Sequence, residues 1–265
     1  MIRSALKDAE RVIIKLGTSS ITHATGKLNI GKIDKIARIV SDLRNQGKEV
    51  IIVSSGAISA GVDRLHLDAR PSTVSGRQAC ACVGQSALME IYNKSFADYG
   101  YCAGQLLLTK DVLDKTTLKN NAQNTLNEML QMNVIPVINE NDSISVDEIR
   151  FGDNDILSAY VAILTSANLL ILLTDTDGLY TDDPKKNPNA KLVLQAKDLS
   201  KELEDTLTND CNKFGTGGML SKVQAAKLAS DNGIHTVIAN ALEPNNIYEI
   251  IDGKEIGTWF SGEKK

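Results

Sequence analysis

Short apolar runs alternate with amphipathic stretches along nearly the whole chain. The runs at 12–14, 49–54, 134–138 and 168–174 are rich in valine, isoleucine and leucine. Continuous apolar runs of this length are typical of strands buried on both faces, as in a parallel sheet. Between the runs, apolar residues recur every three or four positions, as from Ile33 to Leu43, and this period predicts helices.

The same two periods predict the remaining elements. We expect strands at 101–108, 236–239 and 257–260 and helices at about 76–99, 116–132, 155–166, 198–209 and 245–251, with another beginning near Lys222. The helix at 76–99 is expected to bury a stripe formed by Cys80, Val83, Ala87 and Ile91. Because Pro136 removes a backbone donor, its strand is expected at an edge of the sheet or with a local irregularity.

Strands and helices follow one another without a linker or a low-complexity break. This order predicts an α/β protein, a three-layer α/β/α sandwich around a mainly parallel open sheet. A single domain over 1–265 is the simplest account. The alternative is a subdivision into two parts near Asn168 within one continuous sheet.

The charge balance excludes several classes of partner. The 265 residues carry 29 Lys and Arg against 33 Asp and Glu, so there is no basic field to attract nucleic acid or anionic lipid. The longest apolar runs, near 160–164 and 169–173, are too short to span a membrane, and the charged N-terminus lacks a signal-peptide core. The sequence therefore predicts a cytoplasmic protein without nucleic-acid or membrane partners.

The cysteines and histidines form no recognisable site. Only one residue separates Cys80 from Cys82, and no histidine lies at zinc-ligand spacing from them. We expect reduced thiols, no metal site formed by the protein itself, and no catalytic histidine.

Small, polar or charged residues stand at the carboxyl ends of the predicted strands, where open α/β sheets bind their ligands. Lys15 and Gly17 follow the first strand, and the segments 54–57 and 139–142 follow two others. Lys15 would bring a cation to such a site, and Gly17 would let backbone amides approach an anion. A surface lysine after a core strand is the alternative interpretation.

The segment 215–222, Gly-Thr-Gly-Gly-Met-Leu-Ser-Lys, is the strongest local signal for a ligand. Glycines before a helix expose amides beside the positive end of its dipole, which favours an anion, and Lys222 adds a full charge. The segment is not a Walker A loop, and Leu220 stands where a dinucleotide fingerprint needs a glycine. A flexible connector is the alternative.

Carboxylates and amides are concentrated at 139–142 and 152–155. They could bind a substrate ammonium, orient lysines, or hold magnesium through a nucleotide, and ordinary helix capping is the alternative. The patterns of serine hydrolases, metalloproteases and protein kinases are missing. Lysines, glycine loops and acids without an evident nucleophile or imidazole base favour phosphoryl transfer, where positioning and charge neutralisation supply most of the catalysis.

Six stretches together resemble the amino acid kinase family over essentially all of the chain. They are Val-Ile-Ile-Lys-Leu-Gly-Thr-Ser at 12–19, Val-Ser-Ser-Gly-Ala-Ile at 53–58, Pro-Val-Ile-Asn-Glu-Asn-Asp at 136–142, Phe-Gly-Asp-Asn-Asp at 151–155, Leu-Leu-Thr-Asp-Thr-Asp-Gly-Leu-Tyr-Thr-Asp-Asp-Pro at 172–184, and Gly-Thr-Gly-Gly-Met at 215–219. The stretches at 136–142 and 215–219 are the more specific ones, and they resemble the members that phosphorylate glutamate.

The resemblance implies ATP-dependent phosphorylation of the γ-carboxylate of L-glutamate to L-glutamyl 5-phosphate, the first step of proline biosynthesis. It implies that Mg²⁺ is bound mainly through the nucleotide phosphates. It marks Lys15 and Lys222 as catalytic cations and Asp155 as the residue that orients both. By similarity, glutamate would be held by Ser55, Gly56, Asp142 and Asn154, and ATP by Lys15, Gly17, Thr174, Asp175, Thr216, Gly217, Gly218, Met219 and Lys222.

The resemblance also sets expectations for organisation and partners. A part at about 1–167 would bind glutamate and a part at about 168–265 the nucleotide, without the C-terminal PUA-type domain of many relatives. Feedback inhibition by proline, a homo-oligomer (dimer or tetramer) and handover of the product to glutamate-5-semialdehyde dehydrogenase are implied. The competing hypotheses are a kinase of the same family acting on another acid and a catalytically silent sensor of glutamate or proline.

Overall fold

The apolar runs form one seven-stranded sheet with the order β3-β4-β2-β1-β5-β6-β7. The strands are β1 (Arg11–Leu16), β2 (Glu49–Ser54), β3 (Cys102–Leu108), β4 (Val134–Glu140), β5 (Leu169–Thr174), β6 (His235–Asn240) and β7 (Thr258–Phe260). All neighbouring pairs are parallel except β6 and β7. In this computed structural model, the residues described are 3–109, 112, 115–144, 154–182, 184, 186–198 and 218–262.

The helices follow the predicted order, and two short α-helices and two 3-10 helices are added among the described residues. They are η1 (Ser4–Leu6), α1 (Thr18–Ile21), α2 (Ile30–Asn45), α3 (Ala57–Arg64), α4 (Val74–Ala97), α6 (Thr116–Gln131), α8 (Asn154–Leu164), η2 (Ala196–Asp198), α10 (Gly218–Asp231) and α11 (Asn246–Ile251). The sequence did not predict α1 and α3, which are too short to show a clear helical period. The helix expected at 198–209 lies, apart from Asp198, outside the described residues.

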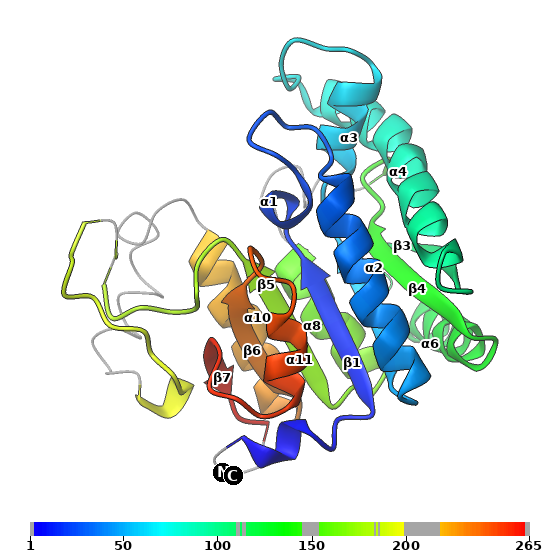
Figure 1. Cartoon of the computed structure of the whole chain (residues 1–265). Coiled ribbons are helices and arrows are strands. Elements are labelled where there is room, and N and C mark those ends of the chain that lie inside the picture. The colour runs from blue at the N-terminus through cyan, green and yellow to red at the C-terminus, as the bar shows by residue number, and fades with distance from the viewer. Residues whose placement is uncertain are drawn as a thin grey trace.

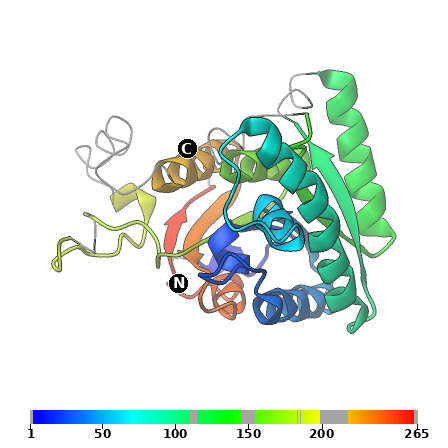
Figure 2. The same cartoon turned by 90° about the horizontal axis from the view of Figure 1, so that it is seen from above.

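Helices cover both faces of the sheet, so the predicted three-layer sandwich is confirmed (Figures 1 and 2). The apolar faces of α2, α4 and α11 pack on one side, and those of α6, α8 and α10 pack on the other. Successive side chains of a strand point to opposite faces. In β1, Val12 and Ile14 face the α2 side and Ile13 faces the α8 side. Lys15 lies two residues after Ile13, so its side chain points to the same face. This face is covered by the helices that begin at the ligand-binding edge.

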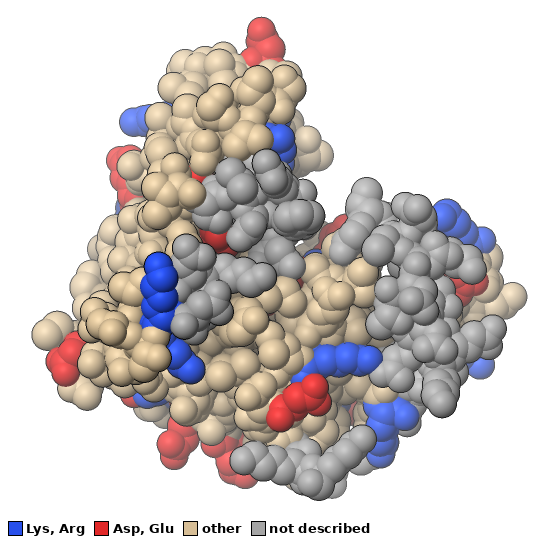
Figure 3. All heavy atoms as spheres, turned by 180° about the vertical axis from the view of Figure 1, so that it is seen from behind, with Lys and Arg blue, Asp and Glu red and all other residues tan. Residues whose placement is uncertain are grey.

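One face of the molecule carries both kinds of charge. On the face seen in Figure 3, Lys and Arg side chains are interspersed with Asp and Glu among the described residues. No helix within the described ranges is both long and apolar enough to cross a membrane.

The expected edge position of the strand containing Pro136 is wrong. In the sheet, β4 lies between β3 and β2, with β3 at the edge. The pairing with β3 includes Pro136 opposite Gly104, whereas the pairing with β2 begins only at Val137 and covers two residues. The missing N–H group of Pro136 is therefore accommodated by the short pairing between β4 and β2. This short pairing is the local irregularity that the sequence offered as the alternative.

The face that α4 buries differs from the predicted stripe. Cys80 is buried as expected, but Val83, Ala87 and Ile91 are only half-buried. The buried positions lie one residue further along and are Ala81, Gly84, Gln85, Leu88, Met89, Tyr92, Ser95 and Phe96. The buried face of α4 includes Gly84, which lies at a helix crossing, and Gln85, which makes a polar contact. Neither residue counts as apolar in a sequence pattern, so the predicted stripe missed this face.

A close crossing of α3 and α4 depends on two glycines. A Cβ atom added at Gly84 would lie 1.8 Å from the carbonyl oxygen of Ala57, and one added at Gly61 would lie 1.8 Å from that of Cys80. Both contacts involve backbone atoms, so neither could be relieved by moving a side chain. The crossing holds α3 directly after Ser54 and Ser55, at the edge of the sheet where the functional residues gather.

We predict that Gly84→Ala lowers the free energy of unfolding by about 3 kcal/mol, because the added methyl forces the two helices apart. Gly31→Ala is the matched control, since Gly31 also lies in a helix but its added Cβ would meet nothing closer than 3.7 Å. Urea unfolding of both variants measures the difference. Equal stability of the two variants would contradict the account of the crossing.

Candidate active site

A cleft of about 500 Å³ opens at the carboxyl ends of β1, β2 and β5. Because these strands are parallel and adjacent, the residues that follow them meet at one edge of the sheet. Of the predicted site residues, those lining the cleft are Lys15, Gly17, Ser55, Asp155, Thr174, Asp175, Gly218 and Lys222. Thr18, Ser19, Thr22, Arg70 and Leu173 line it as well.

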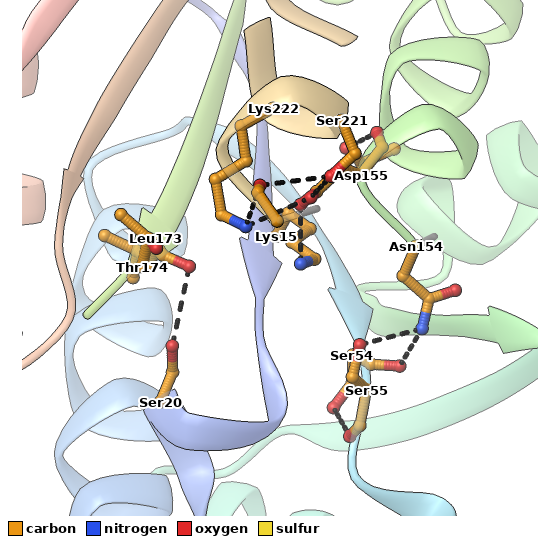
Figure 4. Close-up of polar contacts among 12 residues, drawn as sticks. Lys15, Ser20, Ser54, Ser55, Asn154, Asp155, Leu173, Thr174, Ser221 and Lys222 are labelled. Atoms are coloured by element: carbon orange, nitrogen blue, oxygen red, sulfur yellow. Dashed lines mark hydrogen bonds and ion pairs between the residues drawn. The ribbon is translucent and has the colours of Figure 1, made fainter. Parts of the chain in front are cut away.

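Two lysines from distant parts of the chain share one carboxylate in this cleft (Figure 4). Lys15 Nζ, near the end of β1, lies 2.6 Å from Asp155 Oδ1, and Lys222 Nζ lies 3.2 Å from Asp155 Oδ2. Lys222 also donates a 2.8 Å hydrogen bond to the carbonyl of Gly218, in the first turn of α10. Two cations and one anion leave this cluster with a net positive charge, which attracts an anion entering the cleft.

The carboxylate of Asp155 is held in its ionised form. Its side chain is only 2% exposed, and this burial by itself raises the pKa of Asp155. The charges of Lys15 and Lys222 and the hydrogen bonds from Lys15 and Ser221 outweigh burial, so the pKa of Asp155 lies below its usual value. Ser221 Oγ donates to Asp155 Oδ2 at 2.7 Å. Asp155 is therefore a permanent anion that fixes both lysines.

Glycines keep the space beside each ammonium group open. A Cβ atom added at Gly17 would lie 3.7 Å from Lys15 Nζ, and one added at Gly218 would lie 3.7 Å from Lys222 Nζ. Any larger side chain at these two positions would therefore project toward the ammonium groups. The open space next to two cations and the start of a helix suits the oxygens of a phosphate group.

The first residue of α8, Asn154, is fully buried and binds the end of β2. Its Nδ2 group lies 2.9 Å from Ser55 Oγ and 3.2 Å from the carbonyl of Ser54, as Figure 4 shows, and 2.8 Å from Asn139 Oδ1. Its Oδ1 atom is buried and has no hydrogen-bond partner among the described residues. A donor group on a bound ligand would satisfy this acceptor.

Asp142, which follows β4, is a further buried acceptor. Its side chain is buried, and Oδ1 has no hydrogen-bond partner within the described part of the chain. Burial, together with the nearby charge of Glu140, raises the pKa of Asp142 to about 6, while Arg70 opposes the rise. Asp142 does not line the cleft itself, but Arg70, which acts on its charge, does. A ligand ammonium near Asp142 would favour its ionised form.

The remaining predicted residues differ in how close they lie to the cleft. Gly56 precedes α3 with a φ of 96°, a left-handed conformation that favours glycine. Thr174 Oγ1 donates to Asp175 Oδ1 at 3.1 Å on the cleft wall. Met219, in the first turn of α10, packs against the core on the side of the sheet that α8 covers, and it is not among the residues that line the cleft. Thr216 and Gly217 lie outside the described residues.

The sequence did not single out three residues that belong to this site. Arg70 lies in an exposed polar loop without any period, and nothing in the sequence distinguishes it from a surface arginine. Ser221 was hidden within the glycine-rich segment, although its place beside Lys222 at a helix start could have marked it. Asn139 was recognised only as part of the segment 139–142, and its contact with Asn154 depends on tertiary structure.

The fold and the cleft define a phosphotransferase-like arrangement, and comparisons identify its family. The family model described as "Amino acid kinase family" matches residues 10–240. The chain therefore belongs to the amino acid kinase family. Two solved structures share the fold: isopentenyl phosphate kinase from T. acidophilum (TM-score 0.59, 18% identity, covering 94% of this chain and 99% of that one) and carbamate kinase from Giardia lamblia bound to AMP-PNP (TM-score 0.64, 14% identity, covering 96% and 99%).

Relatives with higher identity are named for one activity. Glutamate 5-kinase from Clostridium perfringens (strain 13 / Type A) is 45% identical over 99% of both chains. Glutamate 5-kinase from Carboxydothermus hydrogenoformans is 47% identical over 100% of this chain and 71% of the relative. Glutamate 5-kinase from Listeria monocytogenes serotype 4b (strain CLIP80459) is 44% identical over 100% of this chain and 97% of the relative.

The raised pKa of Asp142 predicts that its ionised carboxylate lowers the free energy of unfolding of the ligand-free protein. A carboxyl group whose pKa is higher in the folded state binds more protons than the unfolded chain does, so its contribution to stability falls as the pH rises. With a folded pKa of about 6, the fall occurs between about pH 4 and pH 6 and is complete above that range.

We therefore expect Asp142→Asn to raise the free energy of unfolding on the order of 2 kcal/mol at pH 8, because the variant has no charge to bury. The gain should shrink as the pH falls toward 4, where Asp142 is protonated in both states. Urea unfolding of the ligand-free variant and parent across this range measures the effect. A loss of stability at pH 8, or a gain that does not change with pH, would contradict the buried charge.

Proposed function

We propose that this chain transfers the γ-phosphoryl group of ATP to the γ-carboxylate of L-glutamate, giving L-glutamyl 5-phosphate and ADP. This reaction is the first step of proline biosynthesis. The observation that carries the proposal is the pair of lysines on Asp155 inside a cleft at the strand ends, in a chain that is 45% identical over its length to a glutamate 5-kinase.

The proposed transfer needs no general base. A glutamate carboxylate is ionised at neutral pH and already carries the nucleophilic oxygen. That oxygen attacks the γ-phosphorus, the bond from phosphorus to the bridging oxygen breaks, and ADP leaves with the electron pair. The protein must bring two anions into line, and this is a task for cations in a partly buried cleft.

Lys15 and Lys222 are proposed to neutralise the transferring phosphoryl group. At an effective dielectric constant near 20, a lysine about 4 Å from a phosphate oxygen contributes roughly 4 kcal/mol of attraction before desolvation. Asp155 keeps both ammonium groups in place without cancelling their total charge. The glycines at 17 and 218 leave room for phosphate oxygens next to these groups. Mg²⁺ is proposed to enter with the nucleotide phosphates, where it would neutralise further charge.

The acceptor is proposed to bind on the side of Ser55, Asn154 and Asp142. Ser55 Oγ accepts from Asn154, so its own hydroxyl hydrogen remains available to donate to a carboxylate. The oxygens of Asn154 and Asp142 that lack a partner among the described residues are acceptors for the ammonium group of an amino acid. In this assignment residues of about 1–167 supply the glutamate site, and residues of about 168–265, with Thr174, Asp175 and the segment 216–222, supply most of the nucleotide site.

The proposal includes three finer points about partners. Proline acts as a feedback inhibitor, the chain forms a homo-oligomer, and the acyl phosphate passes to glutamate-5-semialdehyde dehydrogenase. The last point follows from chemistry, because acyl phosphates hydrolyse or cyclise readily and must be consumed soon after they form.

Trapping with hydroxylamine tests the proposed reaction directly. The purified chain is incubated with ATP, Mg²⁺, hydroxylamine and, in turn, L-glutamate, L-aspartate, N-acetyl-L-glutamate or carbamate, and hydroxamate and ADP are measured. We expect hydroxamate with L-glutamate. Efficient turnover of another acid would replace the substrate, and binding of glutamate without ADP formation would support the silent sensor.

In the same assay, Lys222→Ala should lower kcat about 10²-fold or more, since it removes a cation from the transferring group. Lys227→Ala is the matched control, a lysine on the same helix that does not line the cleft. Circular dichroism should show both variants folded. Near-normal turnover by Lys222→Ala would exclude Lys222 from the mechanism.

A further inference from the structure

A chain of three buried amides and one exposed amide leads from the side of the cleft to the edge strand of the sheet. Asn154 Nδ2 donates to Asn139 Oδ1 at 2.8 Å, and Asn139 Nδ2 donates to Gln85 Oε1 at 2.9 Å. Gln85 Nε2 then donates to Gln105 Oε1 at 3.1 Å. The first three side chains are buried, at the start of α8, the end of β4 and the middle of α4, whereas Gln105 lies exposed on β3.

Two backbone groups fix the direction of this chain. The carbonyl of Ser54 can only accept, and Asn154 Nδ2 lies 3.2 Å from it, so the NH₂ group of Asn154 must face β2. The amide N–H of Glu140 can only donate, and it donates to Asn139 Oδ1 at 2.9 Å. The NH₂ group of Asn139 must therefore point away from the cleft, where Gln85 supplies the oxygen that accepts its hydrogen bond.

The direction of the chain decides what Asn154 offers to a ligand. With its NH₂ group held by Ser54, Ser55 and Asn139, its Oδ1 atom is the free atom, buried and without a partner among the described residues. If Asn139 turned its amide by half a rotation, its NH₂ group would face the NH₂ group of Asn154. Asn154 Nδ2 would then keep its acceptors on Ser54 and Ser55 but lose the one on Asn139, so its Oδ1 atom would be held less firmly toward the ligand.

We propose that Gln85 is a positioning residue for the acceptor substrate. It is not among the residues that line the cleft, and it acts by holding the amide of Asn139, which in turn supplies one of the three acceptors that hold Asn154. This inference rests on the proposed function, because it takes an amino acid with a free ammonium group as the ligand of Asn154. It also explains why a glutamine occupies a buried position of α4 where a leucine would otherwise be expected.

Two substitutions at Gln85 separate positioning from packing. Gln85→Met keeps the length of the side chain but removes the acceptor for Asn139. Gln85→Glu keeps an acceptor oxygen for Asn139, and the exposed amide of Gln105 can turn to donate to the second oxygen. Ser86→Ala, on the exposed side of the same helix, is the control that should leave all constants unchanged.

The experiment measures kcat and the KM values for L-glutamate and ATP in the full chain, with the unfolding midpoint of each variant. We expect Gln85→Met to raise the KM for glutamate about tenfold, with the KM for ATP within about twofold of the parent. Gln85→Glu should restore the KM for glutamate to within about threefold. A purely structural role would instead lower the folded fraction and leave both KM values of the remaining enzyme unchanged.

Two results would overturn the inference. One is a Gln85→Met variant with an unchanged KM for glutamate, and the other is a Gln85→Glu variant with a KM raised as far as that of Gln85→Met. If Gln85→Met fails to fold, Gln85→Glu alone decides, since the inference requires its KM for glutamate to stay near that of the parent. If the parent chain itself does not phosphorylate glutamate, the proposed function fails instead, and the two failures are thus distinguishable.

Discussion

The site depends on one shared carboxylate. Asp155 brings together Lys15 from the centre of the sheet and Lys222 from a helix more than 200 residues later in the chain, at 2.6 and 3.2 Å. Without it, two ammonium groups in a partly buried cleft would repel each other and would move apart. With it, they form a cluster of net positive charge whose geometry is set before any phosphate arrives. Such preorganisation is what phosphoryl transfer requires from a protein.

The arrangement of the sheet produces this meeting. Lys15 points to the face covered by α8 and α10 because it alternates with the buried residues of β1, and both helices begin at the same edge of the sheet. On the proposed acceptor side there are instead buried oxygens on Asn154 and Asp142 that have no hydrogen-bond partner among the described residues. These groups weaken the ligand-free protein, and a substrate ammonium would satisfy them. Stability and binding are therefore opposed at these positions.

Much of this was readable from the sequence, for a physical reason. Apolar runs identify parallel strands, and small or charged residues after them identify the ligand edge, so Lys15 and the segment 54–57 could be placed at that edge before the structure was known. The resemblance to the amino acid kinase family added the roles of Ser55, Thr174 and Lys222. Contacts between side chains from different elements could not be predicted from the sequence. The face of α4 was displaced by one residue because its crossing uses Gly61 and Gly84, and the interior position of the strand with Pro136 depends on a short ladder to β2. Arg70 and Gln85 have no local signal, since their neighbours in space are far away in sequence.

The most direct test of the shared carboxylate is a double-mutant cycle. kcat is measured with L-glutamate and ATP for the parent, Asp155→Asn, Lys222→Ala and the double variant, with folding checked for each. If Asp155 acts by holding Lys222, the two losses in kcat should not multiply. The double variant should then be no slower than the slower single variant, except for the part of the loss that Asp155→Asn causes through Lys15. Losses that multiply fully in the double variant would show that the two residues act independently, and this result would contradict the account.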